Sequence, residues 1–507
     1  MKKVLLTILL LSGVLLFSSC QGAQREMPRS IDGLSGRSVG VQAGTLYEMD
    51  LQAICPDVKI EYYSDPGMMI LAVKQGQLDA YLTENTGFMY EKKNNPTLEQ
   101  IPGVIATYDV GVGIGNVPGQ QKILDQMNAF IEKCGLDGTT EELTKKWLRE
   151  SDNAERLVDK SSISGENGEL IIGLEPTFEP YSYVSNNEYQ GFDIDFIYRF
   201  CREYGYMPVL EAMNYDSLSS ALSSGKIHVA MNILLEEERQ EEIALSKRYV
   251  SYNIIAVGCP VNAVQESFFR SVAESFEKTF LREDRWKMFL SGALTTILIT
   301  VLSILAGTVL GFAVYLPCRK GGVWANKITS AVIWLLHGTP EVLLLMIFYF
   351  VFFGKTAVPK TAVAVIMFSL LFAAAVFGML ESGEKAVGKG QLEAALSQGF
   401  SPREAYFLII LPQSARFFLP TFRGEIVSLI KETAIVGYIA ITDLTKMSDM
   451  VRSRTFEAFF PLISTAVIYF IISGILTSVV KRIEHYIDPE KRSTEEILKG
   501  IRTADKK

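Results

Sequence analysis

Residues 390–413, GQLEAALSQGFSPREAYFLIILPQ, form a charged, amphipathic stretch between two long apolar runs. Crossing a bilayer takes about 20 consecutive apolar residues, so each flanking run is long enough to span a membrane. Within the stretch, Gly399 separates two short helical patterns, and Ser401-Pro402 is a typical helix start. The sequence therefore predicts a compact helical elbow, residues 390–413, which projects into water from a bundle of membrane helices.

The apolar runs predict five membrane-spanning helices, the fourth of which contains Lys431 and Glu432. With the N-terminal half outside the cell, the Lys- and Arg-bearing loops, the elbow and the tail from Lys481 all fall in the cytoplasm, as the positive-inside rule asks. The predicted spans lie in residues 288–317, 333–354, 361–380, 426–441 and 458–480.

The elbow resembles the EAA loop of bacterial ABC importer permeases and matches every specified position of that pattern. The alternative is an ordinary amphipathic cytoplasmic loop. The resemblance implies that the elbow sits in a groove of a separate ATPase and passes its movement to the spans. The chain has no GxxxxGK[ST] motif, so ATP and Mg²⁺ are expected on that partner, and no cofactor in this chain. The matching residues are Glu393, Ala394, Ala395, Gly399, Ile409, Leu411 and Pro412.

Two further stretches resemble polar amino acid permeases. Residues 337–341, HGTPE, are similar to an Arg-Gly-Thr-Pro segment, with His337 in place of Arg, and residues 424–434 resemble the segment that follows the EAA loop. The resemblance covers about 285–490. Charges at membrane depth are costly and often functional. For Glu341, Glu425 and Lys431, packing or helix-end solvation competes with substrate contact.

The polar N-terminal half resembles the substrate-binding proteins of the same importers, with its two lobes in reversed order. Residues 168–258 are similar to the first lobe, 29–117 to the second lobe and 118–148 to the C-terminal return segment. We therefore expect one circularly permuted, two-lobed α/β domain over 29–262, which is tolerable where chain ends meet at the surface. The alternative is two truncated copies. A linker (263–286), a permease domain (287–490) and a tail (491–507) follow.

An amino acid zwitterion needs a cation on one side of its pocket and an anion on the other. By resemblance, Arg239 binds the carboxylate through its planar fork, aided by the amides near Thr45. Glu84 stands where the family places the ammonium partner, and Glu175 lies beside the ligand side chain. Without the resemblance, Arg239 in EEER would be a solvated helix face. Phe178 and Tyr215 match the two aromatics that sandwich the ligand, and alone would be core residues.

Two departures concern the carboxylate side of that pocket. Leu234 replaces a small hydroxyl residue, and Asn232 replaces a glycine. Carboxylate binding would then depend more on backbone amides, or the ligand is atypical. The two acidic candidates favour a basic side chain or glutamine.

The N-terminus, MKKVLLTILLLSGVLLFSSCQG, has the layout of an export signal over residues 1–20. Its ending resembles a lipobox with Phe17 where Leu is usual, which implies a lipidated Cys20; an uncleaved anchor or ordinary cleavage is the alternative. The other five cysteines lack metal-ligand spacing, so we expect no metal site. The net charge of −8 argues against nucleic acid as a partner.

Together these features predict the binding and permease subunit of an ABC importer for a polar L-amino acid in the bacterial cytoplasmic membrane. It would act as a homodimer with two ATPase subunits and catalyse no covalent chemistry itself. A ligand-gated channel or sensor is the first alternative, but neither uses an EAA loop. An enzyme on the binding-protein fold is the second, but neither the three histidines nor the carboxylates form an obvious acid–base pair in the sequence.

Overall fold

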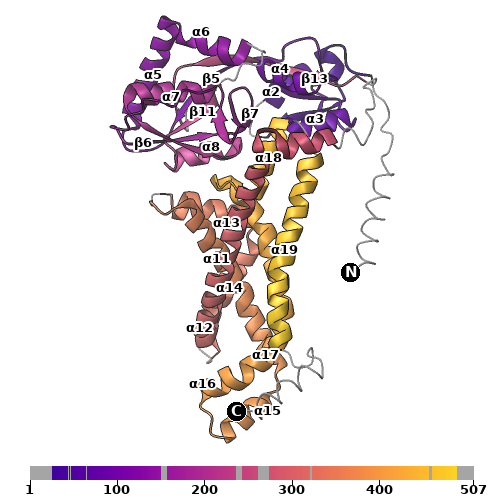
Figure 1. Cartoon of the computed structure of the whole chain (residues 1–507), viewed down its shortest axis with the longest axis vertical. Coiled ribbons are helices and arrows are strands. Elements are labelled where there is room, and N and C mark those ends of the chain that lie inside the picture. Colours follow the sequence, from indigo (N-terminus) through magenta and orange to yellow (C-terminus); the bar gives the residue numbers. More distant parts are fainter. Residues whose placement is uncertain are drawn as a thin grey trace.

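The computed structural model describes residues 26–43, 45, 47–63, 66–149, 157–235, 243–260, 273–319, 323–354, 356–455 and 459–487. An α/β region comes first, and a helical region follows it along the chain (Figure 1). This order confirms the predicted fold class.

The α/β region is built on one ten-stranded sheet with the order β10-β6-β11-β5-β13-β3-β1-β2. Its inner strands are almost fully buried because helices cover both faces, as is usual for parallel strands. Strands β12 (Ala244–Leu245) and β4 (Glu99–Gln100) pair with β5 and β13. The strands of the main path are β1 Ser38–Gln42, β2 Lys59–Tyr63, β3 Ala80–Glu84, β5 Ala106–Ile114, β6 Glu169–Leu174, β10 Met207–Ala212, β11 Val229–Leu234 and β13 Val250–Gly258.

Two long strands join the halves of this sheet into two lobes. Strand β5 pairs with β11 along its second half, and β13 pairs with β5 along its first half and with β3 along its second. One lobe therefore holds β6, β10 and β11, and the other holds β1, β2 and β3. The helices around them are α2 Tyr47–Ile54, α3 Pro66–Lys74, α4 Asn85–Asn94, α5 Gln120–Asp137, α6 Thr139–Leu143, α7 Phe192–Tyr204 and α8 Tyr215–Ser223.

A three-stranded sheet lies beside the first lobe, and short helical turns complete the α/β region. The small sheet has the order β7-β8-β9. Its strands are β7 Thr177–Phe178, β8 Ser182–Ser185 and β9 Glu188–Gln190, and the turns are η1 Ile31–Leu34 and η2 Thr144–Arg149.

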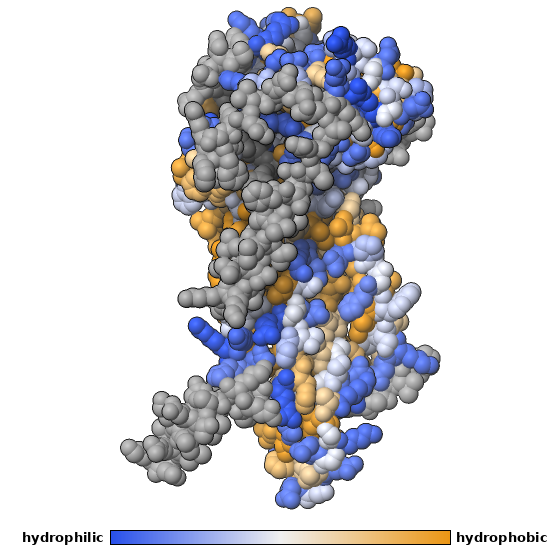
Figure 2. Space-filling view, turned by 90° about the vertical axis from the view of Figure 1, so that its right-hand side faces the viewer, coloured by the Kyte–Doolittle hydropathy of each residue, from blue (hydrophilic) through white to orange (hydrophobic). Residues whose placement is uncertain are grey.

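The helical region begins after the turns η3 (Glu277–Leu281) and η4 (Arg282–Asp284). Hydrophobic side chains gather on it, whereas hydrophilic ones cover the α/β region (Figure 2). Its elements are α11 Trp286–Cys318, α12 Val323–Gly338, α13 Glu341–Met346, η5 Ile347–Phe352, α14 Lys360–Ala386, α15 Lys389–Ser397, α16 Pro402–Glu404, η6 Ala405–Ile410, α17 Leu411–Glu432, η7 Thr433–Ile439, α18 Leu444–Thr455 and α19 Phe459–Ile487.

Among the described residues, three helices are long and apolar enough to cross a membrane: Trp286–Cys318, Lys360–Ala386 and Phe460–His485. A fourth span arises if Ala325–Gly338 and Glu341–Phe352, bent by 108°, count as one. These correspond to the first, third, fifth and second predicted spans.

The fourth predicted span, 426–441, does not lie in a helix that is long and apolar enough to cross a membrane. It is divided between the end of α17 and η7, and α17 starts at Leu411, well before the predicted position. The part of α17 that precedes residue 426 carries Arg416 and Arg423, so apolarity alone did not reveal this helix. A total of five spans stays a prediction.

Glycines let α11 approach α14 closely. A Cβ on Gly311 would lie 2.7 Å from Val376 Cβ, and one on Gly307 would lie 2.8 Å from the Ser369 carbonyl oxygen. Small residues serve this purpose between membrane helices, where close packing replaces the hydrophobic effect.

The α/β region and the elbow lie at opposite ends of the helical region (Figure 1). At one end, α18 contacts β7, and at the other, α15 and α16 form the elbow. Helices α11, α14, α17 and α19 run between the two ends (Figure 1).

Candidate functional site

A small cavity lies between the two lobes of the α/β region. Its volume is about 20 Å³, and both lobes and the connecting strand β13 contribute to its wall. The lining residues are Gln42, Thr45, Tyr47, Glu84, Glu175, Phe178, Ser182, Tyr215, Leu218, Met231, Asn232 and Tyr252.

Five of the six substrate-binding residues predicted from the sequence line this one cavity. They come from both lobes and from segments far apart in the chain: Thr45, Glu84, Glu175, Phe178 and Tyr215. The sixth, Arg239, lies outside the described residues, as do Gly44 and Leu46. The structure thus brings together every predicted pocket residue that it describes, while their roles stay predictions.

Glu84 ends strand β3 at the second-lobe wall of the cavity and is only 4% exposed. One carboxylate oxygen accepts a hydrogen bond from the Tyr47 hydroxyl at 2.8 Å. Burial raises the pKa of Glu84 to about 7, because removal from water disfavours the charged form, and the Tyr47 hydrogen bond opposes that rise.

Glu175 follows strand β6 and links the lobes across the cavity. Both of its carboxylate oxygens accept from the Gln42 side-chain amide, at 3.1 and 3.2 Å, and one also accepts from the Thr177 hydroxyl at 2.8 Å. Gln42 belongs to the second lobe and Glu175 to the first. This carboxylate therefore contributes to lobe closure as well as negative charge.

Aromatic rings form much of the remaining wall. Phe178 stacks on Tyr181 with ring centroids 4.9 Å apart, and Tyr252 lies edge-on to Phe178 at 6.4 Å. Tyr215 starts helix α8. Such a wall suits the aliphatic part of a ligand, with hydroxyl groups at its edges.

Asn232 explains one departure from the family pattern. Its φ is 61°, in the left-handed region that glycine and, among other residues, asparagine tolerate best. Its side-chain oxygen accepts from the Tyr252 hydroxyl at 3.2 Å. Asparagine thus fills a glycine position and adds a polar group to the cavity wall.

Sequence reasoning missed several lining residues, above all Gln42, Tyr47 and Tyr252. Tyr47 and Tyr252 are almost fully buried. In sequence they read as ordinary core residues, and only the folding together of β1, α2 and β13 brings them to one wall.

The elbow has the two predicted short helices, which are separated at Gly399 with φ of 88°. Helix α16 starts with a capping box: the Glu404 amide donates to the Ser401 hydroxyl at 3.3 Å, and the Ser401 amide donates to the Glu404 carboxylate at 2.8 Å. Of the motif residues, Glu393, Ala394 and Pro412 are exposed, Ala395 is buried, and Ile409 and Leu411 are half-buried.

The outer surface of the elbow is unusually apolar for a segment in water. Leu396, Phe400, Phe407 and Leu408 are all exposed there. Exposed apolar groups of this kind mark surfaces that contact another protein or a membrane. The elbow is tied to the bundle by Arg319, which donates to both Glu384 oxygens at 2.7 and 2.8 Å and lies 4.2 Å from the Tyr406 ring centroid.

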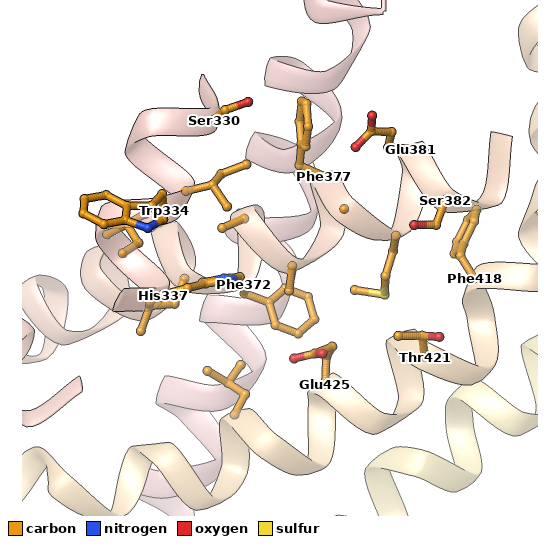
Figure 3. A pocket seen from close by; sticks show the side chains of 18 of the residues that line it. Ser330, Trp334, His337, Phe372, Phe377, Glu381, Ser382, Phe418, Thr421 and Glu425 are labelled. Atoms are coloured by element: carbon orange, nitrogen blue, oxygen red, sulfur yellow. The ribbon is translucent and has the colours of Figure 1, made fainter. Parts of the chain in front are cut away.

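A larger cavity, about 880 Å³, opens between α12, α14 and α17 in the helical region. Figure 3 shows His337, Phe372, Glu381 and Glu425 around it. Glu341, singled out from the sequence, lines it as well, whereas Lys431 is not among its lining residues. Polar and apolar side chains of the helical region both line this cavity.

Comparison with known proteins gives matches to both regions. The family model "Binding-protein-dependent transport system inner membrane component" matches residues 299–493, and "Bacterial extracellular solute-binding proteins, family 3" matches 170–335. A putative glutamine transport system permease protein of Rickettsia felis is 30% identical over 199 residues, which are 38% of this chain and 89% of that relative.

Two other matches cover a similar share of this chain. The arginine transport system permease protein ArtQ of Bacillus subtilis is 31% identical over 201 residues, 38% of this chain and 90% of that relative. Among solved structures, the crystal structure of an amino acid ABC transporter with histidines is 27% identical, covers 44% of this chain and all of that chain, and has a TM-score of 0.37.

Proposed function

The chain belongs to the family of binding-protein-dependent transport system inner membrane components, and from this premise we propose how its parts work together. It is a fused binding-protein and permease subunit of an amino acid ABC importer. The two-lobed region captures a polar L-amino acid between its lobes. The permease region then passes the amino acid across the membrane.

One observation supports this division of labour best: the α/β region, which contains the cleft, and the elbow lie at opposite ends of one helical bundle (Figure 1). An importer needs its capture site outside and its ATPase contact inside. The binding region therefore belongs outside the cell, tethered through a lipidated Cys20, and the elbow belongs in the cytoplasm.

In the cleft, Glu84 takes the ammonium of the ligand and Arg239 its carboxylate, with amides near Thr45 assisting. Phe178 and Tyr215 hold the aliphatic part, and Glu175 faces the ligand side chain. Burial of Glu84 in the cavity wall and the aromatic lining support these roles. The cavity volume of about 20 Å³ suits one water molecule, so the lobes have to part before an amino acid enters.

The binding region is a circular permutation of the family fold. In the unpermuted order, the strand equivalent to β13 would continue directly into the second lobe. Here the end of that strand, Gly258, packs against Met27, near the start of the described chain: a Cβ on Gly258 would lie 3.2 Å from the Met27 Cγ atom. The solute-binding family model matches from residue 170, the second residue of β6, to residue 335 in the helical region, and its start supports a beginning of the family fold at this strand.

In the membrane, α17 and η7 supply a fifth span, with Arg423 directed toward α19 in the bundle. The ion pair between Arg423 and Glu484 of α19, at 3.2 Å, supports this. The cavity of about 880 Å³ is the translocation space. Two copies of the chain form the complete passage, and two ATPase subunits, which hold ATP and Mg²⁺, bind the exposed apolar surface of the two elbows.

Reconstitution tests this function. The chain and its ATPase are placed in liposomes and supplied with ATP and each labelled amino acid, L-arginine and L-glutamine first. Accumulation should require active ATPase and should cease with a hydrolysis-deficient ATPase. Equal accumulation with both ATPases would refute an ABC importer and favour a channel.

A further inference from the structure

The cleft segment 175–181 makes the contacts that close the two lobes. Glu175 accepts from the Gln42 amide of the second lobe, and the Tyr181 hydroxyl lies 2.9 Å from the Thr86 hydroxyl of the same lobe. Phe178, between them, forms part of the cavity wall. A movement of this segment would therefore change lobe closure and ligand contact together.

Helix α18 of the permease region holds the same segment from the other side. The Ser453 hydroxyl donates to the Thr177 carbonyl oxygen at 2.5 Å. One Arg454 guanidinium nitrogen donates to both carboxylate oxygens of Glu179, at 2.5 and 2.6 Å. The guanidinium also lies 4.9 Å from the Tyr183 ring centroid.

This ion pair is shielded from water, which distinguishes it from an ordinary surface pair. The Glu179 side chain is 9% exposed and the Arg454 side chain 22%. Arg454 also reaches Glu283 at 3.4 Å, and Glu283 pairs with Arg285 at 3.1 Å, directly before α11. Removal of one partner would leave an uncompensated buried charge, so the network holds its parts together strongly.

The other end of α18 is anchored to both regions. Lys446 donates to the Asn214 side-chain oxygen at 2.5 Å. Asn214 directly precedes the cavity residue Tyr215. The Leu444 amide donates to the Thr296 hydroxyl of α11 at 3.2 Å. One helix thus connects the first membrane helix to both ligand-bearing segments of the first lobe.

We propose that α18 is a lever through which the permease sets closure of the amino-acid cleft, with Arg454 and Ser453 as positioning residues for segment 175–181. The proposal rests on the importer function above. When the permease changes state, α18 moves, segment 175–181 moves with it, and the contacts of Glu175 and Tyr181 to the second lobe break. The amino acid is then released above the translocation cavity.

The test compares ligand affinity in two states of the full chain, reconstituted with its ATPase in lipid nanodiscs. Labelled L-arginine and L-glutamine are the probes, without nucleotide and after trapping with ATP and vanadate. In the wild type, trapping should weaken binding at least about tenfold, within the 5–150-fold range of typical allosteric coupling. In Arg454→Gln, the ratio of the two affinities should fall below about threefold.

The ratio separates a lever from a merely structural role, because a general packing defect changes both affinities alike. Arg282→Gln is the matched control: it removes the same charge from an exposed pair with Glu277 near the junction and should keep the wild-type ratio. Ser453→Ala, which removes no charge, should also lower the ratio of the two affinities. This variant tests the lever if Arg454→Gln does not fold. A wild-type ratio in the folded variants would overturn the lever.

Failure of the lever and failure of the importer function give different results. If the wild type binds neither probe and shows no amino acid-stimulated ATP hydrolysis, the importer function itself is refuted. If the wild type couples normally and the Arg454 and Ser453 variants do so as well, only the lever is refuted.

Discussion

The affinity of the cleft for an amino acid should depend on pH through Glu84. This carboxyl is buried in the cavity wall, its pKa is raised to about 7, and it is the proposed partner of the ligand ammonium. Only the ionised form of Glu84 attracts an ammonium. The fraction of the protein that is competent to bind the ligand therefore follows the titration of Glu84. L-Arginine and L-glutamine are suitable ligands, since their side chains do not titrate near neutral pH.

The size of the effect follows from the pKa of about 7. Apparent affinity scales with the competent fraction, which is roughly 3% at pH 5.5 and roughly three quarters at pH 7.5. Binding should therefore strengthen about 25-fold between these two values. Isothermal titration calorimetry on the full chain at several pH values measures this change, and binding near pH 6 should also release protons.

Two variants isolate the group responsible. Glu84→Gln should bind weakly, with no change in affinity over this range. Glu91→Gln is the matched control, because burial also raises the pKa of Glu91 to about 7, yet this residue bonds to the Tyr81 hydroxyl at 2.6 Å and does not line the cavity. A flat wild-type profile, or a slope that survives in Glu84→Gln, would refute Glu84 as the ammonium partner.

The same pKa fixes the sign of a stability effect. The folded-state pKa of Glu84 lies above its unfolded value of 4.5, so stability falls as pH rises from about 4.5 to 7 and is level above that. At pH 8, ionisation of this buried carboxyl lowers the free energy of unfolding by on the order of 3 kcal/mol. Glu84→Gln should therefore raise the melting temperature at pH 8 but not at pH 4.5. A lower melting temperature at pH 8 would contradict this.

Three further substitutions test other parts of the account. Gly399→Asp places a side chain at a position with a φ of 88° on the elbow. It should abolish ATP-dependent uptake in liposomes and leave amino acid binding within about twofold of wild type. Persistent uptake would show that the elbow is misassigned. Gly311→Leu should destabilise the chain by about 1–3 kcal/mol through its clash with Val376, which a lower melting temperature would show. Gly474→Leu, where the added side chain meets open space, should not lower the melting temperature. Equal effects of the two substitutions would contradict the α11–α14 packing. Phe178→Ala should weaken amino acid binding by calorimetry about tenfold, or about 1.4 kcal/mol, and unchanged binding would remove it from the site.

The elbow could be predicted because its information is local. The glycine with positive φ, the Ser401-Pro402 start and the alanines of α15 lie within one short stretch, and each has a direct conformational meaning. The long apolar helices α11, α14 and α19 were predictable for the same reason, since length and apolarity suffice.

Helix α17 shows where sequence reasoning is limited. The part of α17 before residue 426 carries charged residues, and α14 and α19 cover it within the helical bundle, as with Phe422 against Phe372 and Arg423 against Glu484. A hydropathy criterion is calculated from the residues of one helix and takes no account of the helices that pack against it.

The cleft was predictable only in part, for a related reason. Glu84 and Phe178 were identified through a family pattern, whereas Tyr47 and Tyr252 lie on the wall because β1, β3 and β13 meet in one sheet. The contact between Arg454 and Glu179 joins residues 275 positions apart, and neither sequence neighbourhood suggests the other.

Cross-linking from the elbow tests the central mechanical claim most directly. A photoreactive amino acid at Leu396, which is 43% exposed, can be activated in membrane vesicles that contain the chain and its ATPase. Cross-links to the ATPase subunit, formed on the cytoplasmic face, are predicted. Labelling of this position from the outside of intact cells, without any cross-link to the ATPase, would contradict the account.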